Sequence, residues 1–224
     1  MNKLLNISIS IFMTAISFTF FHKTSLAFDD GDFQYWNSES ISWKIDDNWK
    51  AKLEEEFRFG NDAGDFYYQH SDLGAIYSGI ADWLDIGFNY RQIFEEKNSD
   101  WKYENRPHLN ATVKLKLGDF KLSNRGRFEY RNREGADTLW RYRNKFTIKF
   151  PFKLTQLEIQ PYVADEIFVD FDKEELNRNR LYAGFSLKLL KNLKGEIYYL
   201  RQSSKKSGRW TDYNVLGTKV KLSF

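Results

Sequence analysis

The sequence predicts an all-β protein, a transmembrane antiparallel β-barrel of about 10 to 12 strands with a polar, charged lumen. Three observations predict this fold class. Apolar and polar residues alternate along most of the chain from Phe33 onward, with the period of two that β-strands require. The alternating stretches greatly exceed the roughly five or six residues of an average soluble strand. The chain also ends in an alternating stretch that closes on an aromatic residue.

Residues 1–27 have the layout of a secretory signal peptide. Lys3 supplies the positive start, the segment 7–21 is an apolar run, and Ser25 to Ala27 fits a small-residue cleavage site. The alternative is a membrane anchor, but a spanning helix needs roughly 20 apolar residues and this run is shorter. We therefore expect a signal peptide over 1–27, cleaved near Ala27, and one barrel domain over 28–224. The expected location is the outer membrane of a Gram-negative bacterium.

The strands follow from the alternation. In the stretch 138–150, Trp140 and Phe146 share one face while Arg141 and Arg143 share the other. We count eleven such stretches, whereas bacterial barrels of this class usually have an even number. We prefer twelve, with a short extra strand within 28–36, over ten. The expected strands are 33–45, 48–59, 67–80, 83–96, 101–117, 120–134, 138–150, 155–170, 176–190, 193–204 and 209–224.

The connections are expected to alternate in length, because outer-membrane barrels have short turns at one end and longer loops at the other. The short ones are expected at 46–47, 81–82, 118–119, 151–153 and 191–192. The longer ones are expected at 60–66, 97–100, 135–137, 172–175 and 205–208.

Lipid, rather than a dry protein core, is the expected surrounding of the apolar face. A soluble barrel or sandwich would show the same alternation with inside and outside exchanged. Strand length and the aromatic residues near strand ends, such as Trp83, Trp140 and Trp210, favour the membrane. Glu55 lies on the apolar side of its strand and fits poorly. It is either a tolerated acid or the sign of a β-bulge that switches the face.

Composition excludes several classes of function. Cysteine is absent, which excludes disulfides and thiolate metal sites. Without residues 1–27, basic and acidic residues nearly balance, which argues against nucleic acid as a partner. Only His70 and His108 remain as catalytic bases, and no glycine–serine motif of a lipid-hydrolysing barrel is present. We therefore expect no enzyme activity, no cofactor and no transition metal. A calcium site in acidic loops such as 170–172 is an open alternative.

The sharpest candidate site is a set of charged residues on the inner faces of the strands. Side chains from opposite walls of a narrow barrel can meet, and Arg and Glu should then pair. The leading interpretation is a structural barrel whose lumen is salt-bridged and largely plugged. A narrow anion-preferring channel or a barrel that binds a small ligand or lipid is the alternative, since basic residues outnumber acids, and a lipid-modifying enzyme is a further one. The expected network comprises Arg58, Arg91, Arg106, His108, Arg125, Arg127, Glu129, Arg131, Arg141, Arg143, Glu166, Arg178 and Arg180; Lys50, Lys52, Glu54, Glu56, Glu158 and Glu196 are also expected to point inward.

The last strand carries a second candidate signal. Its pattern of Gly217, Val220, Leu222 and the terminal Phe224 is typical of the C-terminal signal that the barrel-assembly machinery reads. The expected partners are that machinery during insertion, then outer-membrane lipid and lipopolysaccharide. We expect a monomer.

Several segments have a recognisable order along the chain. They include LEEEFRFG (53–60), ENRPHLN (104–110), FKLSNRGRFEYR (120–131), NRNRLYAGF (177–185) and YNVLGTKVKLSF (213–224). In this order the chain resembles an uncharacterised family of exported Gram-negative outer-membrane β-barrel proteins, catalogued as a domain of unknown function. The resemblance covers essentially the whole expected mature chain. It implies a fold and a location, and it implies no activity and no catalytic residues.

Overall fold

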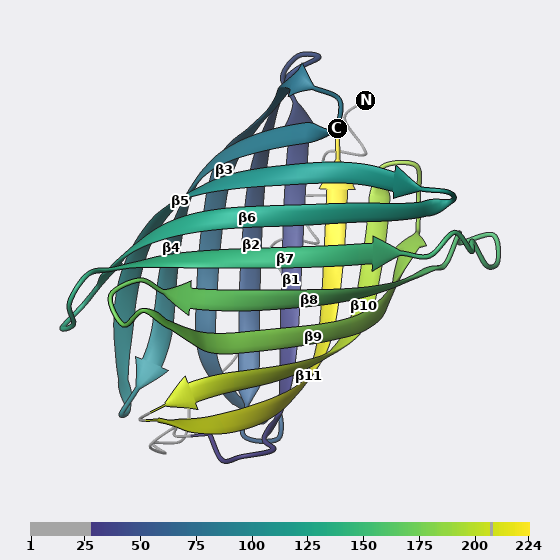
Figure 1. The fold of residues 1–224 in the computed structure, drawn as a ribbon. Helices are drawn as coiled ribbons and strands as arrows, with labels where there is room; N and C mark the ends of the chain where they lie inside the picture. Colours follow the sequence, from purple (N-terminus) through teal and green to yellow (C-terminus); the bar gives the residue numbers. More distant parts are fainter. Residues whose placement is uncertain (1–27, 207) are drawn as a thin grey trace, which may run out of the picture.

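The computed structural model describes residues 28–206 and 208–224, and every regular element in them is a β-strand. The eleven strands follow one another in chain order around a closed barrel (Figure 1), which confirms the all-β barrel. No helix in these residues is long and apolar enough to cross a membrane. The expected signal peptide, 1–27, lies outside the described residues. The strands are β1 Phe33–Lys44, β2 Trp49–Gly60, β3 Asp65–Ala81, β4 Leu84–Lys97, β5 Asp100–Leu117, β6 Phe120–Arg133, β7 Leu139–Lys149, β8 Gln160–Asp170, β9 Glu175–Lys188, β10 Leu193–Lys206 and β11 Arg209–Ser223.

The barrel closes through a parallel pair. Strands β1 and β11 pair in parallel from Phe33 opposite Asn214 to Ser42 opposite Ser223, while every other neighbouring pair is antiparallel. Successive hairpins reverse the chain, so an odd number of strands leaves the first and the last pointing the same way. The preference for twelve strands is therefore not confirmed: residues 28–32 form no strand, and 33–36 belong to β1.

Backbone hydrogen bonds extend this seam at both ends. The Phe224 amide donates to the Ser42 carbonyl at 2.9 Å, and the Lys44 amide donates to the Phe224 carbonyl at 3.0 Å. At the opposite end of the barrel, the Asn214 amide donates to the Asp32 carbonyl at 2.9 Å. Both chain ends of the described barrel are thus tied to its wall.

All predicted strands are present, and only β8 departs clearly from its predicted start. It begins at Gln160 rather than at residue 155. Leu154 and Ile159 form an isolated bridge around a turn in which Thr155 and Glu158 have φ angles of 63° and 46°. Positive φ is incompatible with a strand, so the alternation in this segment does not reflect strand structure.

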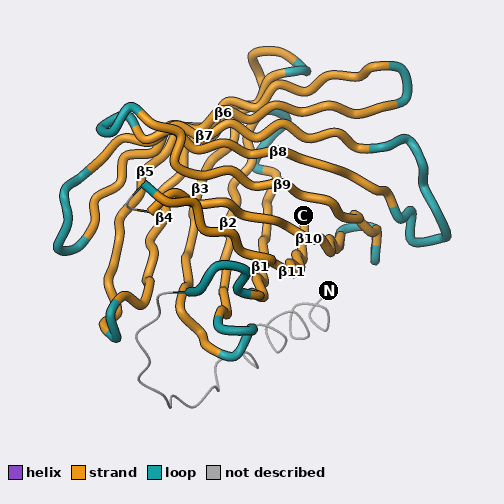
Figure 2. The backbone as a smooth tube through the Cα atoms, turned by 60° about the horizontal axis from the view of Figure 1, so that its bottom comes forward, coloured by secondary structure: helices purple, strands orange, loops and turns teal. Residues whose placement is uncertain are grey.

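The predicted division of the connections by length is wrong. The connection at 150–159 is the longest in the described chain and lies at the Phe224 end, where short turns were expected. At the other end, the connection at 98–99 is tight; Figure 2 shows the connections in teal. The reason is that the ladders continue through polar residues such as Asp65 and Lys97. Backbone hydrogen bonding does not require apolar side chains.

The distribution of side chains is the reverse of that in a soluble protein. Leu73, Phe88 and Leu117 on the outer face are 57–69% exposed, while Arg91 and Glu129 inside are 0–6% exposed. Glu55 stays on the outer face, where the Ser71 hydroxyl donates to it at 2.8 Å. The β2–β3 ladder is regular there, so no bulge switches its face.

Candidate functional site: the charged interior of the barrel

The interior contains most of the charged residues that the sequence points to. Arg91, Arg106, His108, Arg127, Glu129, Arg141, Arg143, Glu166 and Arg180 are buried. Arg58, Arg125, Arg131 and Arg178 are partly buried and line the interior cavities.

Two buried carboxylates organise the β6–β8 wall; we call this the Glu129–Glu166 cluster. Glu129, 0% exposed, accepts hydrogen bonds from Arg141 at 2.5 and 2.8 Å and from Arg143 at 2.9 Å. Glu166 accepts from Arg143 at 2.8 Å and from Arg125 at 3.1 Å. Arg143 thus bridges the two acids. Such charge-assisted, multiply bonded pairs are the strong class of hydrogen bond.

A second cluster centres on Asp72, an inward-facing residue of β3. The Arg91 guanidinium contacts its carboxylate at 2.7 Å, the Asn89 amide donates to it at 2.7 Å, and His108 Nε2 lies 3.0 Å away. The Arg127 Nε donates to Asn110, which in turn lies 3.1 Å from His108 Nδ1. Asp72 was absent from the predicted network. Its alternation with His70 on one face was the available signal.

Glu104, near the start of β5, is a further acid that brings arginines together, and it was also absent from the predicted network. It accepts from Arg106 at 2.6 Å and from Arg131 at 2.7 and 2.8 Å. It precedes Arg106 by two positions, which is the spacing that puts both side chains on one face. Acids at this spacing from predicted inward arginines are the sequence signal for such partners.

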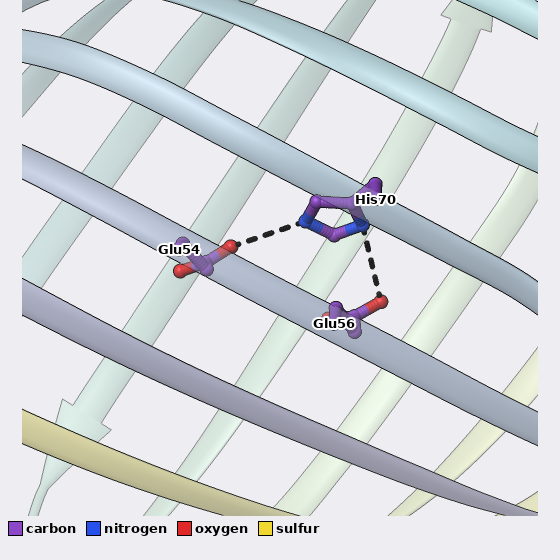
Figure 3. A group of neighbouring side chains, drawn as sticks. All are labelled: Glu54, Glu56 and His70. Atoms are coloured by element: carbon purple, nitrogen blue, oxygen red, sulfur yellow. Dashed lines mark hydrogen bonds and ion pairs between the residues drawn. The ribbon is translucent and has the colours of Figure 1, made fainter. Parts of the chain in front are cut away.

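Glu54, Glu56 and His70 form a further group on β2 and β3 (Figure 3), and these three could be considered as metal ligands. Their geometry does not fit a shared ion. Glu54 lies 3.5 Å from His70 Nε2 and Glu56 lies 3.8 Å from Nδ1, so the acids approach opposite ring nitrogens. Each acid also has a cation partner, Lys52 at 2.6 Å for Glu54 and Arg58 at 2.5 Å for Glu56. The group belongs to the ion-pair network.

The acidic loop at 170–172, considered above for calcium, uses its carboxylates on the backbone. Asp170 accepts from the Asp172 amide at 3.1 Å, and Asp172 accepts from the Trp140 amide at 3.2 Å. These contacts cap a turn between β8 and β9.

Part of the interior is filled by uncharged side chains, although the same strands also carry inward charges such as Arg180 and Lys219. A buried cluster gathers aromatic and aliphatic residues from β8 to β11 and β1; we call it the aromatic wall. The sequence analysis placed large apolar residues outside and missed it. Its members are Trp36, Tyr162, Ala164, Tyr182, Tyr198, Leu200 and Val215.

Aromatic rings also hold the arginines in place across the interior. The Arg58 guanidinium stacks 3.7 Å from the Trp36 ring centre and 4.1 Å from that of Tyr68. Phe168, 1% exposed, is surrounded by Arg141, Arg143, Arg178 and Arg180 at 4.5–5.5 Å. Cation–π contacts of this kind strengthen when water is excluded.

A β-bulge contributes to this arrangement. The β2–β3 register shifts between Arg58 and Phe59, so Tyr67 is an extra residue between Tyr68 and Phe66. Both tyrosines are 6% exposed. A bulge re-aims a side chain in this way, and strict alternation could not have predicted it.

Between the side chains lie two cavities that share part of their lining. The larger, about 450 Å³, reaches the end of the barrel where Lys97 and Asn98 lie, and we call it the vestibule. The smaller, about 110 Å³, is lined by Trp36, Glu54 and Lys219 among others. Four arginines line both cavities and stand between them: Arg58, Arg91, Arg143 and Arg180.

The residues of the predicted C-terminal signal lie on both faces of β11. Val220 and Phe224 are 38% and 60% exposed on the outside, and Leu222 is partly exposed. Gly217 faces inward opposite Tyr198. A Cβ atom at Gly217 would lie 2.0 Å from the Tyr198 ring, so the missing side chain makes room for that ring.

The structure corrects the prediction that Glu158 lies on an inner strand face. It lies in the connection at 150–159 rather than in β8. Its carboxylate pairs with Lys153 and accepts a hydrogen bond from Lys188 at 2.8 Å. These two hydrogen bonds, Lys153 first, lower the pKa of Glu158 to about 2.

Comparison with known proteins adds a family and no activity. No curated protein matches the chain. A family model described as "Protein of unknown function (DUF2490)" matches residues 33–214, which run from the first residue of β1 into β11. That range covers most of the chain and contains both ion-pair clusters and every residue of the aromatic wall except Val215. The chain therefore belongs to the DUF2490 family of proteins of unknown function.

Proposed function

We propose that this protein is a structural β-barrel of the Gram-negative outer membrane whose lumen is closed by its own side chains. The observation that carries the proposal is the inside-out distribution of residues around a closed barrel. Large apolar side chains such as Leu117 are exposed, while acids such as Glu129 and Glu166 are buried. In water this exposed apolar surface would be unfavourable. In lipid it is the expected outer wall of a barrel.

Tryptophans at both ends of the barrel support membrane insertion. Trp43 and Trp83 lie at the Phe224 end and are 40% and 53% exposed. Trp140 and Trp210 lie at the opposite end and are 51% and 48% exposed. Aromatic residues at two levels are typical of the two interfaces of a bilayer. On this basis lipid and lipopolysaccharide are the proposed surroundings, and the β11 pattern ending at Phe224 is the proposed signal for the assembly machinery.

The arrangement between the two cavities supports a closed lumen. Arg58 is held by Glu56 at 2.5 Å and by stacking on Trp36. Arg143 is held by both Glu129 and Glu166. Moving Arg58 aside would take the arginine partner from Glu56, and moving Arg143 aside would remove one counter-charge from each of Glu129 and Glu166. Both changes are unfavourable for buried acids.

A narrow anion-preferring passage is the second candidate, and one observation favours it. Basic residues far outnumber acids in the lining of the vestibule, where Glu95 and Glu96 are the acids. Rings of one charge set the selectivity of pores. The two candidates share a fold and a location and differ in whether the central arginines separate.

The test uses the full chain refolded into vesicles and planar bilayers. Brominated lipids should quench the fluorescence of the exposed tryptophans, and the free chain in buffer should not remain folded and monomeric. A folded soluble monomer would contradict the membrane proposal. In planar bilayers the closed barrel gives no stepwise current, whereas anion-selective steps would select the second candidate. No catalysis is proposed, so turnover of phospholipid or lipopolysaccharide by the purified protein would contradict this assignment.

A further inference from the structure

On the side of the vestibule formed by β9 and β10, two side chains have hydrogen-bond donors and no acceptor within the described part of the chain. The side chain of Arg178, a residue of β9, makes no hydrogen bond or ion pair with any other described residue. Its guanidinium lies 5.5 Å from the Phe168 ring centre. Every other arginine around Phe168 contacts a carboxylate: Arg141 and Arg143 contact Glu129, and Arg180 lies 3.7 Å from Glu166. Arg178 is therefore the guanidinium with its full set of donors available.

The residue opposite Arg178 reinforces this imbalance. Ser204 of β10 pairs with Arg178 of β9 in the ladder, so the two side chains lie side by side on the inner face. The Ser204 hydroxyl is buried and has no hydrogen-bond partner among the described residues. The next inward pair is Gln202 with Arg180, in which Arg180 Nε donates to Gln202 at 2.7 Å. Buried donors without acceptors are unfavourable, so this corner suits a ligand that brings acceptors.

Neither of the two acids that line the vestibule, Glu95 and Glu96, forms an ion pair with Arg178 in the described part of the chain. Glu95 pairs with Lys97 at 2.8 Å. Glu104 is occupied by Arg106 and Arg131. The inner surface of the vestibule thus presents guanidinium groups, while the carboxylates that neutralise most of them are already engaged. A phosphate group fits this surface because guanidinium forks bind its oxygens in pairs.

The size and lining of the vestibule define the rest of the ligand. A volume of about 450 Å³ falls within the range of roughly 300–1,000 Å³ for small-molecule sites and exceeds what a single phosphate fills. Aromatic rings, among them Tyr67, Tyr68 and Phe168, and the amides of Asn98 and Gln202 line other parts of its surface. Such amides both donate to and accept from hydroxyl groups. A hydroxylated body such as a sugar matches them.

We propose that the vestibule is a binding site for sugar phosphates, with Arg178 as the principal phosphate ligand beside Ser204. The phosphorylated sugar can be a free metabolite or the headgroup of a lipid, because both present the same chemistry. This inference goes beyond the closed barrel proposed above and does not depend on conductance or on insertion into a bilayer.

The test is calorimetric titration of the refolded full chain in detergent. Hexose phosphate, inorganic phosphate and unphosphorylated hexose are the three probes. We expect hexose phosphate to bind most tightly and the free hexose not to bind. Arg178→Gln should weaken hexose phosphate binding about tenfold or more, because it removes a charged hydrogen-bonding group. Arg201→Gln is the matched control: this arginine lies on the outer face of β10, 58% exposed, with Asp212 as its partner.

Two further comparisons keep the result interpretable. Ser204→Ala should weaken binding by a smaller factor without removing a charge, so it tests the site if Arg178→Gln fails to refold. A phosphorylated glycolipid in mixed micelles should compete with hexose phosphate if the headgroup is the source, and should not if the free sugar phosphate is. No binding of hexose phosphate, equal binding of inorganic phosphate, or unchanged affinity in both variants would overturn the proposal. A bilayer experiment that fails while binding persists would count against the membrane role alone.

Discussion

The two walls of the barrel interior are built on different principles. On β2 to β8, which we call the charged wall, ion pairs meet at Asp72, Glu104, Glu129 and Glu166. The aromatic wall is filled by rings and aliphatic groups such as Tyr198 and Leu200. Both walls fill space, but the charged wall also has to balance charge at every position. Loss of one acid there removes a counter-charge from several arginines at once, whereas loss of contact area in the aromatic wall has a graded effect.

The largest expected effect is on the charged wall. Glu129→Gln leaves Arg141 and Arg143 without their shared counter-charge, and it also removes the nearby charge from Arg127 at 3.6 Å. Breaking a buried ion pair by removing one partner costs about 3–5 kcal/mol. We therefore expect a decrease of that size in the free energy of unfolding, measured by urea denaturation of the refolded barrel in detergent.

Glu55→Gln is the matched control for this variant. Glu55 lies on the outer face, where its partner is the Ser71 hydroxyl, and no arginine depends on it. Its substitution should leave the unfolding midpoint nearly unchanged. Equal effects of the two substitutions would show that burial of Glu129 among arginines does not distinguish it energetically.

A smaller effect is expected on the aromatic wall. Gly217→Ala places a Cβ atom against the Tyr198 ring, at 2.0 Å before any movement. The ring must shift, and overpacking of this kind costs about 1–3 kcal/mol. The same urea experiment, with near-ultraviolet circular dichroism of the tyrosines, should show a moderate loss of stability and a changed aromatic signal.

Gly195→Ala provides the control within the neighbouring strand. A Cβ atom there would lie at least 3.4 Å from its neighbours, on Leu189 and Leu187, which is an ordinary contact. We expect no loss of stability. A loss in Gly195→Ala as large as in Gly217→Ala would indicate a general requirement for glycine in these strands instead of a specific fit to Tyr198.

Alternation was sufficient to predict the barrel, the strand positions and the orientation of most charged residues. Each of these depends on a local rule, because neighbouring side chains in a strand point to opposite faces. The rule assigned Arg141 and Arg143 to one face and Trp140 to the other, as the structure has them. It failed where the backbone departs from a regular strand, at the Tyr67 bulge and in the turn that contains Glu158.

The ion-pair partners of the interior residues could not be predicted from the sequence, for a different reason. Ion pairs such as Arg125 with Glu166 join strands that are not neighbours in the sheet, since β7 lies between β6 and β8. Such pairings depend on curvature and on side-chain conformations that no local pattern encodes. The aromatic wall was missed because tyrosine and tryptophan occur on both faces of the barrel, so the residue type does not tell which way the side chain points. The number of strands could not be settled by alternation either. It depends on how the barrel closes, because a parallel β1–β11 pair makes an odd number possible.

The smallest effect is expected outside both walls, at Glu158. Its pKa is lowered to about 2 by hydrogen bonds from Lys153 and Lys188, so the pairs stabilise the folded state above the usual glutamate pKa of about 4.3. That contribution is lost as the pH falls from there through about 2. Exposed ion pairs contribute little and are screened by salt. Glu158→Gln should therefore lower the thermal midpoint only slightly at pH 7 in low salt, and the difference from the parent should vanish in high salt and near pH 2.

Asp82→Asn, in a turn at the same end of the barrel, removes a charge that makes no ion pair with other described residues, and it should show neither dependence. A large decrease in Glu158→Gln that persists in high salt would mean that the connection at 150–159 contributes to the barrel through packing, and the contrast between the two walls would then extend to a third region.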